Sequence, residues 1–251
     1  MLKYGDKIGI AACSNARSLT EKNSIVRLLD TLEKLHFIPV LSSCIYETDS
    51  THSAPAKERA KALMDFHRDD SIKAIFDISG GDIANGILEF LDYDCIKAHP
   101  KPFWGYSDLT VVLNALYQKT GNLSYLYQVK NLIWKHGEEQ TKNFKGSVLD
   151  GQNNLFDVRW QFVQGKQMEG IVIGGNIRCF LKLAGTVYLP DFQNKLLFLE
   201  SNSGKTEQMT AYLYQLKQLG AFDRISGLLL GLSLIHIFLI QSRAVFLLLL
   251  H

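Results

Sequence analysis

The sequence predicts an α/β protein built around a parallel sheet. Two observations carry this prediction: short apolar runs alternate with amphipathic stretches of helical period, and glycine or polar turn residues separate them. Strands that are joined through helices lie parallel, and the helices then cover both faces of the sheet. In such sheets the functional residues gather at the carboxyl ends of the strands.

Each expected element has a local reason. The apolar run from Lys7 to Ala12 predicts the first strand, and apolar residues between Glu21 and Leu35 recur at helical spacing. The same patterns predict strands at 37–41, 72–78, 101–106, 170–175 and 195–200, and helices at 56–66, 108–119 and 205–219. Residues 121–157 are polar and lack a clear period. We therefore expect an α/β domain at 1–125, a linker at 126–160 and a partial second domain at 161–231.

The composition is that of an ordinary globular protein. Of the 251 residues, 47% are hydrophobic and 21% are charged, which excludes a disordered chain or a collagen-like repeat. The 27 lysines and arginines against 25 aspartates and glutamates leave a net charge of +2. Because this charge forms no clustered basic stripe, we expect no nucleic-acid partner.

The cysteines and histidines show no metal-binding pattern. Cys13, Cys44, Cys95 and Cys179 are scattered without a CxxC pair, so we expect buried free thiols rather than a zinc site or a disulfide framework. None of the seven histidines has HExxH or H-x3-H spacing. We expect no metal and no cofactor, and the absence of a secretory signal pattern at the start favours the cytoplasm.

The chain ends in an unusually apolar stretch that begins at Gly227. A membrane span needs about 20 apolar residues, but Gln241 to Arg243 would interrupt this one near its middle. A buried strand and helix would show turn residues and a polar face, which are nearly absent after Ser233. The third interpretation is that residues 232–251 are not native sequence.

The strongest local feature is Gly105-Tyr106-Ser107-Asp108, where a strand turns sharply into a helix. A serine on such a turn projects its hydroxyl above the sheet edge, where the positive end of the helix favours a developing negative charge. The G-x-S-x-G pattern itself is absent, because its last position is Leu109. Serine is also a preferred N-cap residue, and these four residues alone favour the cap.

Two other strand ends carry residues of catalytic types. Gly80 and Gly81 close one strand, and adjacent glycines let a backbone N–H approach an oxyanion, although an ordinary turn explains them equally well. Glu200 ends the apolar run at 196–199, where its carboxylate could orient a histidine base. Its residue type alone favours a solvated strand end.

Together these segments resemble the LD-carboxypeptidase family, which includes the microcin C immunity peptidases. The stretch from Pro55 to Gly121 resembles the core of that family, and LKYGDKIGIAACS, GGNIRCFLKLAGT and LLFLE match it in order and spacing. The resemblance covers residues 2–231. Its ordered series of Gly-Gly, Pro-Lys and Gly-Tyr-Ser-Asp is more specific than any single motif.

The resemblance implies a serine carboxypeptidase that hydrolyses an L-to-D peptide bond at the C-terminus of murein tetrapeptides during cell-wall recycling. It implies a flavodoxin-like N-terminal sheet and a smaller, β-rich C-terminal domain. Ser107 would be the nucleophile, and Glu200 would orient a catalytic histidine. The backbone N–H groups of Gly81 and Asp108 would form the oxyanion hole. The expected partners are a peptide or muropeptide substrate and a second copy of the chain in a homodimer, with no membrane.

The sequence also departs from the family pattern. Cys13-Ser14 stands where the family usually has Pro-Ser, and Leu126-Tyr127-Gln128 stands where it usually has Gly-Pro. The family's histidine belongs to a Gly-His motif, and neither His236 nor His251 follows a glycine. We therefore expect residues 232–251 to be out-of-frame sequence on a shortened gene product, and the chain itself to have little or no activity.

Three alternatives remain open at this point. The chain could be a microcin C immunity-type peptidase that cleaves an aminoacyl-nucleotide-like antibiotic. It could be a non-catalytic protein that binds a muropeptide without cutting it. It could also be a membrane protein anchored by its apolar tail.

Overall fold

The computed structural model describes residues 1–48, 52–158, 160–201, 204–233 and 247–250. The chain divides into two compact units, Met1–Asp157 and Val158–His251. Each unit contains its own sheet.

The first unit contains a five-stranded sheet in the order β2-β1-β3-β4-β5, and all of its strand pairs are parallel. This is the flavodoxin-like strand order, as the resemblance implied. The strands are β1 (Lys7–Ala11), β2 (Ile38–Leu41), β3 (Ile72–Asp77), β4 (Phe103–Gly105) and β5 (Tyr125–Leu126). Because the strands are parallel, their carboxyl ends lie along one edge of the sheet.

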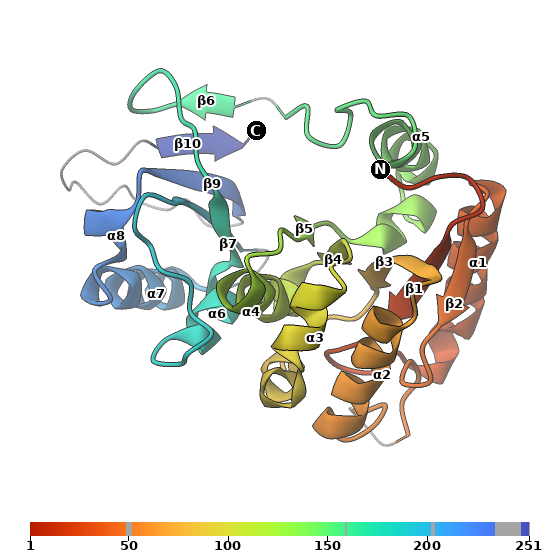
Figure 1. Ribbon diagram of the computed structural model, residues 1–251. Coiled ribbons are helices and arrows are strands. Elements are labelled where there is room, and N and C mark those ends of the chain that lie inside the picture. Colours follow the sequence, from red (N-terminus) through yellow and green to blue (C-terminus); the bar gives the residue numbers. More distant parts are fainter. Residues whose placement is uncertain (49–51, 159, 202–203, 234–246, 251) are drawn as a thin grey trace. The chain divides into compact units, whose positions relative to one another are not determined.

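Helices cover both faces of this sheet (Figure 1). On one face, α1 and α5 contribute Leu28 and Phe144 to the core beneath β1, β3 and β4. On the other face, Gly9 lies against Phe66 of α2 and Gly105 lies against Leu109, just before α4. The expected strands and helices of this unit are confirmed. Its helices are α1 (Lys22–Lys34), α2 (Ala56–Arg68), α3 (Tyr93–Ala98), α4 (Thr110–Thr120) and α5 (Gly137–Val148), with 3-10 helices η1 (Leu19–Glu21), η2 (Ala84–Phe90), η3 (Ser107–Leu109) and η4 (Val129–Ile133).

The polar segment expected to be a linker contains ordered elements in the structure. Residues 126–148 include the end of β5, η4 and α5. Phe144 of α5 is fully buried, and its ring centroid lies 5.7 Å from that of Phe76 and 6.1 Å from that of Trp104. One large aromatic side chain therefore attaches an otherwise polar helix to the core. The buried residues of this helix are only Phe144, Gly146 and Val148, too few to give the sequence a clear apolar period.

The second unit is also of the α/β type, and the predicted strands and helix of this region are confirmed. Its sheet order is β6-β10-β9-β8-β7, in which β7 to β10 pair in parallel and β6 pairs antiparallel with β10. The elements are β6 (Trp160–Phe162), β7 (Val172–Asn176), α6 (Ile177–Phe180), η5 (Leu181–Leu183), β8 (Leu196–Ser201), α7 (Thr206–Gln218), α8 (Ala221–Arg224), β9 (Gly227–Ser233) and β10 (Leu247–Leu250).

The apolar C-terminal stretch falls partly outside the described residues. Its described parts continue β9 to Ser233 and form β10, whereas 234–246 and 251 lie outside the description. No helix within the described ranges is both long enough and apolar enough to cross a membrane.

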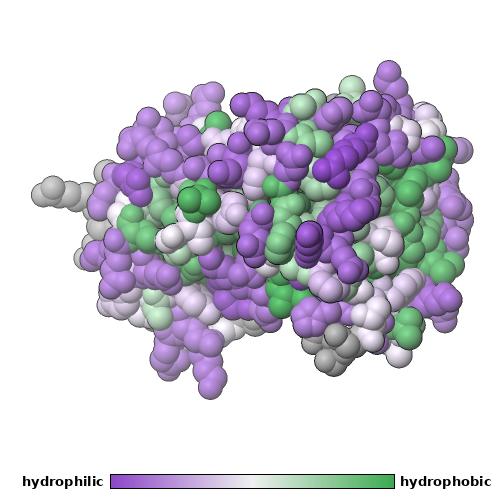
Figure 2. Space-filling view, turned by 60° about the horizontal axis from the view of Figure 1, so that its bottom comes forward, coloured by the Kyte–Doolittle hydropathy of each residue, from purple (hydrophilic) through white to green (hydrophobic). Residues whose placement is uncertain are grey.

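The surface has the mixed polarity of a globular protein. Figure 2 shows one face on which hydrophilic side chains predominate and hydrophobic groups lie between them. Exposed apolar side chains scattered among polar ones are normal for a folded protein.

His67 in the last turn of α2 is buried, with only 1% of its surface exposed. Its Nδ1 lies 3.4 Å from the carbonyl oxygen of His99, and its Nε2 has no hydrogen-bond partner among the described residues. The end of a helix favours a cation, but here burial has the larger effect and lowers the pKa of His67 to about 4. The neutral imidazole is therefore the form that the fold accommodates.

We expect this histidine to make the protein less stable in mild acid. The unfolded imidazole binds a proton near pH 6.5, but the folded one does so only near pH 4. The free energy of unfolding therefore loses nothing to this histidine above pH 6.5, and it falls by about 3 kcal/mol as the pH drops from 6.5 to 4. Urea unfolding followed by tryptophan fluorescence should show this slope in the wild type and a flatter one in His67→Gln.

The exposed His136, whose side chain makes no capping hydrogen bond, provides the matched control. His136→Gln should keep the wild-type slope. Parallel pH profiles for the wild type and His67→Gln would contradict this prediction.

Candidate functional site

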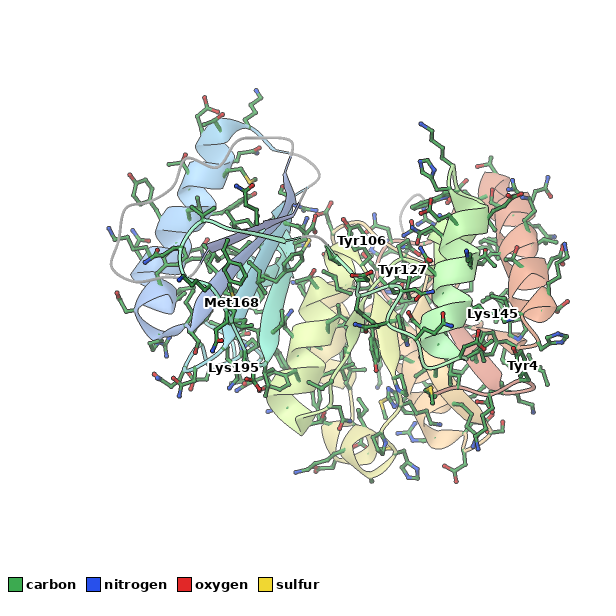
Figure 3. The ribbon with its side chains drawn as sticks, turned by 90° about the horizontal axis from the view of Figure 1, so that it is seen from above. Tyr4, Tyr106, Tyr127, Lys145, Met168 and Lys195 are labelled. Atoms are coloured by element: carbon green, nitrogen blue, oxygen red, sulfur yellow. The ribbon has the colours of Figure 1, made fainter. Side chains whose placement is uncertain are left out.

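Three loops meet the carboxyl edge of the first sheet, one after each of β1, β3 and β4. They contain residues 13–15, 79–84 and 106–108. Tyr106, the residue before Ser107, marks the third loop in Figure 3. Ser107, Asp108 and Gly81 therefore lie at the same edge of one unit, as their positions at strand ends predicted.

The turn at Ser107 is strained. Ser107 has φ +58°, in the left-handed region that residues other than glycine, asparagine and aspartate seldom adopt. Gly105 makes the sharp turn possible, because a Cβ on this residue would lie 2.7 Å from Cβ of Leu109. The local geometry is thus that of a strand-to-helix elbow with a serine at its tip.

Ser107 does not cap the following helix, so the interpretation that its local sequence favoured is wrong. The residues that cap η3 and α4 are Tyr106 and Leu109, and neither makes a side-chain capping bond. The Ser107 side chain is half-buried, and within the described residues its hydroxyl takes part in no hydrogen bond. The elbow therefore presents a serine hydroxyl next to the start of α4.

Gly81 has a conformation and an environment that only glycine fits. Its φ is +129°, and a Cβ would lie 2.1 Å from Oδ1 of Asn15. That same Oδ1 accepts a hydrogen bond from the N–H of Asp82 at 2.9 Å, and Asn15 pairs with Gly80 through a β-bridge. The glycine pair thus packs against the loop that follows β1. An ordinary turn would not need this contact.

The carboxylate of Asp108 joins all three loops. Asp108 is fully buried, and its Oδ2 accepts hydrogen bonds from the Ser14 hydroxyl at 2.6 Å and from the Ala84 N–H at 2.8 Å. Ser14 belongs to the loop after β1, and Ala84 begins η2 in the loop after β3. A single oxygen of the elbow therefore contacts both neighbouring loops.

A second buried carboxylate lies at the end of β3. Asp77 accepts hydrogen bonds from the N–H groups of Cys13 and Ser79, each at 2.7 Å, and from the Ser79 hydroxyl at 2.5 Å. The Ser79 hydroxyl oxygen in turn accepts a hydrogen bond from the Ser14 N–H at 2.9 Å. Burial raises the pKa of the Asp77 carboxyl in spite of these donors.

Arg59 of α2 places a positive charge beside these carboxylates. It is 3% exposed and donates hydrogen bonds to the carbonyl oxygens of Cys13, Ser14 and Ala54. Sequence reasoning missed Arg59, Asp77 and Ser14. The available signals were an arginine in an amphipathic helix and an aspartate that closes a largely apolar strand, because charged residues are seldom buried without a partner.

Glu200 lies in the second unit, at the end of β8. It is 6% exposed, so the expectation of a solvated strand end, which its residue type favoured, is wrong. It stands opposite Asn176 in the register of β7 and β8, and a Cβ on Gly231 of β9 would come within 3.0 Å of its Cβ. The neighbouring strands therefore pack closely around the backbone and Cβ of Glu200.

Several histidines are excluded as partners of Ser107 by their position. His36, His67 and His99 precede β2, β3 and β4, so they lie near the opposite edge of the sheet. His236 and His251 lie outside the described residues.

A hollow of about 480 Å³ opens at the edge of the sheet opposite Ser107, and Lys3, Lys73, Trp104 and Tyr125 are among its lining residues. None of its lining residues belongs to the Ser107 turn.

The fold and the elbow define the class of protein: a flavodoxin-like α/β domain with a strained serine at the carboxyl edge of its sheet. The sequence matches the LD-carboxypeptidase N-terminal domain over residues 8–127 and the LD-carboxypeptidase C-terminal domain over residues 169–237. The chain belongs to the LD-carboxypeptidase family.

Curated relatives and solved structures agree with this assignment. The chain is 28% identical to the microcin C7 self-immunity protein MccF of Escherichia coli, across 92% of this chain and 76% of that protein. It is 27% identical to a probable murein peptide carboxypeptidase of Bacillus subtilis, across 91% and 72%. The crystal structure of an MccF-like protein from Bacillus anthracis aligns with a TM-score of 0.83 at 26% identity, covering 99% of this chain and 88% of that one.

We expect Gly81→Ala to destabilise the first unit by about 1–3 kcal/mol, because the new Cβ would require both an unfavourable φ and a shift of Asn15. Gly80→Ala is the matched control, since a Cβ at Gly80 meets nothing within 4 Å. Urea unfolding of the two variants measures the difference. Equal stabilities would show that the loop relaxes freely around Gly81.

Proposed function

We propose that this protein is a serine carboxypeptidase that hydrolyses an L-to-D peptide bond at the C-terminus of murein tetrapeptides, in cytoplasmic cell-wall recycling. The observation that carries the proposal is the elbow at Ser107, with φ +58° and a hydroxyl that makes no hydrogen bond among the described residues. Strained serines of this kind are typical of nucleophiles in acyl transfer. Membership of the LD-carboxypeptidase family supports the reaction class.

In this proposal Ser107 Oγ attacks the carbonyl carbon of the terminal peptide bond, and a histidine oriented by Glu200 takes its proton. The negative charge of the tetrahedral intermediate is stabilised by the backbone N–H groups of Gly81 and Asp108 and by the start of α4. The C–N bond breaks as the amine of the D-amino acid receives the proton. Water then hydrolyses the acyl-serine ester and restores the hydroxyl.

The histidine is the part of this mechanism that we assign to no residue of the chain. Loss of the base removes most of the activation of a serine nucleophile, which lowers rates by several powers of ten. We therefore propose that the chain retains the nucleophile and the oxyanion-stabilising loops but turns over peptides slowly.

A second candidate function rests on the similarity to MccF. That protein has been solved in complex with glutamyl sulfamoyl guanosine and with aspartyl sulfamoyl adenosine. The chain is as similar to MccF as it is to the probable murein peptide carboxypeptidase, at 28% and 27% identity. An aminoacyl-nucleotide-like substrate is therefore the alternative to a murein peptide.

We expect a fluorophosphonate probe to modify the wild-type protein at Ser107, because the elbow exposes this hydroxyl to an electrophile. Intact-mass and peptide mass spectrometry should locate one phosphonyl group per chain. Ser107→Ala should remain unlabelled, whereas Ser24→Ala on α1 should be labelled like the wild type.

A non-catalytic binding protein would give the opposite pattern. It would bind a muropeptide tightly with or without the Ser107 hydroxyl, and its labelling would not exceed that of the heat-denatured chain. That result would falsify the proposed nucleophile.

We expect release of D-alanine from a peptide ending in L-Lys-D-Ala to exceed release of alanine from the L-Lys-L-Ala diastereomer. Overnight incubations at high protein concentration, analysed by chiral chromatography, give the ratio even if turnover is slow. Aspartyl sulfamoyl adenosine in a parallel reaction tests the alternative. Cleavage of this compound without release of D-alanine would favour the MccF-like function.

A further inference from the structure

The backbone and the side chain of Asp108 have separate roles in the elbow. Its backbone N–H is one of the two proposed oxyanion donors, and its side chain points away into the protein, where it is fully buried. Burying a carboxylate is strongly unfavourable unless hydrogen bonds compensate for its lost hydration. A neutral side chain could fill the same space with a smaller desolvation penalty, so the hydrogen bonds of this carboxylate need an explanation.

Those hydrogen bonds lead to the other proposed donor. Oδ2 of Asp108 accepts the Ala84 N–H at 2.8 Å, three residues after Gly81, and the Ser14 hydroxyl at 2.6 Å. The residue next to Ser14 is Asn15, whose Oδ1 accepts the Asp82 N–H at 2.9 Å and packs against the α-carbon of Gly81. The Gly81 loop is therefore held from both sides, by Asp108 directly and by the Ser14-Asn15 pair.

We propose that the Asp108 carboxylate and the Ser14 hydroxyl are positioning groups that fix the distance between the two oxyanion donors. This inference rests on the proposed function and adds to it the residues that hold the Gly81 loop against the elbow. Neither side chain touches the substrate. An oxyanion hole is most effective when both donors are preorganised, and a displacement of about 1 Å can lower a rate by about 100-fold.

The test uses p-nitrophenyl acetate, whose good leaving group makes acylation of Ser107 observable without efficient turnover. Attack by Ser107 Oγ forms an acetyl ester and releases p-nitrophenolate, while the serine proton passes to water or buffer. Ser14→Ala removes one hydrogen bond to Asp108, and we expect its maximal acylation rate to fall by about 10- to 100-fold with little change in the half-saturating ester concentration. Ser14→Thr keeps a hydroxyl and should recover most of the rate.

Asp108→Asn keeps an acceptor oxygen of the same shape and should lose less activity than Asp108→Ala. Thr120→Val is the control for loss of a buried hydroxyl: Thr120 lies at the other end of α4 and donates to the Leu116 carbonyl at 2.7 Å. This variant should acylate like the wild type even if its melting temperature falls. A structural role alone would instead make the rates follow the melting temperatures.

The outcomes separate the two proposals. If wild-type acylation does not exceed that of Ser107→Ala, the proposed nucleophile is wrong, and the positioning role is overturned with it. If acylation depends on Ser107 but Ser14→Ala reacts at the wild-type rate, the proposed function stands and the positioning role is wrong. Because Ser14→Ala is a small change, the result does not depend on whether Asp108→Ala folds.

Discussion

The carboxyl edge of the first sheet depends on two buried carboxylates that replace the hydrogen bonds of strand pairing. Where parallel strands end, their amide groups lose their partners, and an unsatisfied buried N–H is costly. Asp77 accepts the amides that follow β1 and β3, and Asp108 accepts the amide at the start of η2. The loops that carry Gly81 and Ser107 take their shape from these acceptors.

This arrangement places negative charge close to a site that is proposed to stabilise an oxyanion. The conflict is reduced because Arg59 is buried among the same loops and because Asp108 directs its carboxylate toward Ser14 and Ala84. Hydrogen-bonded and partly neutralised, the carboxylates can organise the loops without opposing the charge that develops at the serine. Removal of Arg59 would leave both acids with their hydrogen bonds but without the nearby positive charge, and an unbalanced buried charge is destabilising.

The sequence predicted the elements of the first sheet because their signals are local. The apolar runs of β1 and β3 and the helical stripe of α1 each lie within one short window. The tertiary contacts could not be predicted in this way: Cys13 and Asp77 are 64 residues apart, and Ser14 and Asp108 are 94 apart. Ser107 shows the same limit, since its local sequence favours a helix cap while the structure gives it a strained φ and no capping bond. The sequence was enough to place Gly81 and Glu200 at strand ends, but it could not predict the tight packing around Gly81 or the burial of Glu200.

The helix α5 has a consequence for dividing the protein into fragments. A fragment that stopped where the apolar pattern ends, near residue 125, would lack both Tyr127 and Phe144 and would expose the rings of Phe76 and Trp104 to water. It would also lose Val148, whose carbonyl accepts the Leu2 N–H, and so would release the start of the chain. The compact unit that contains the serine therefore extends to Asp157, and a helix with few apolar residues connects its two ends.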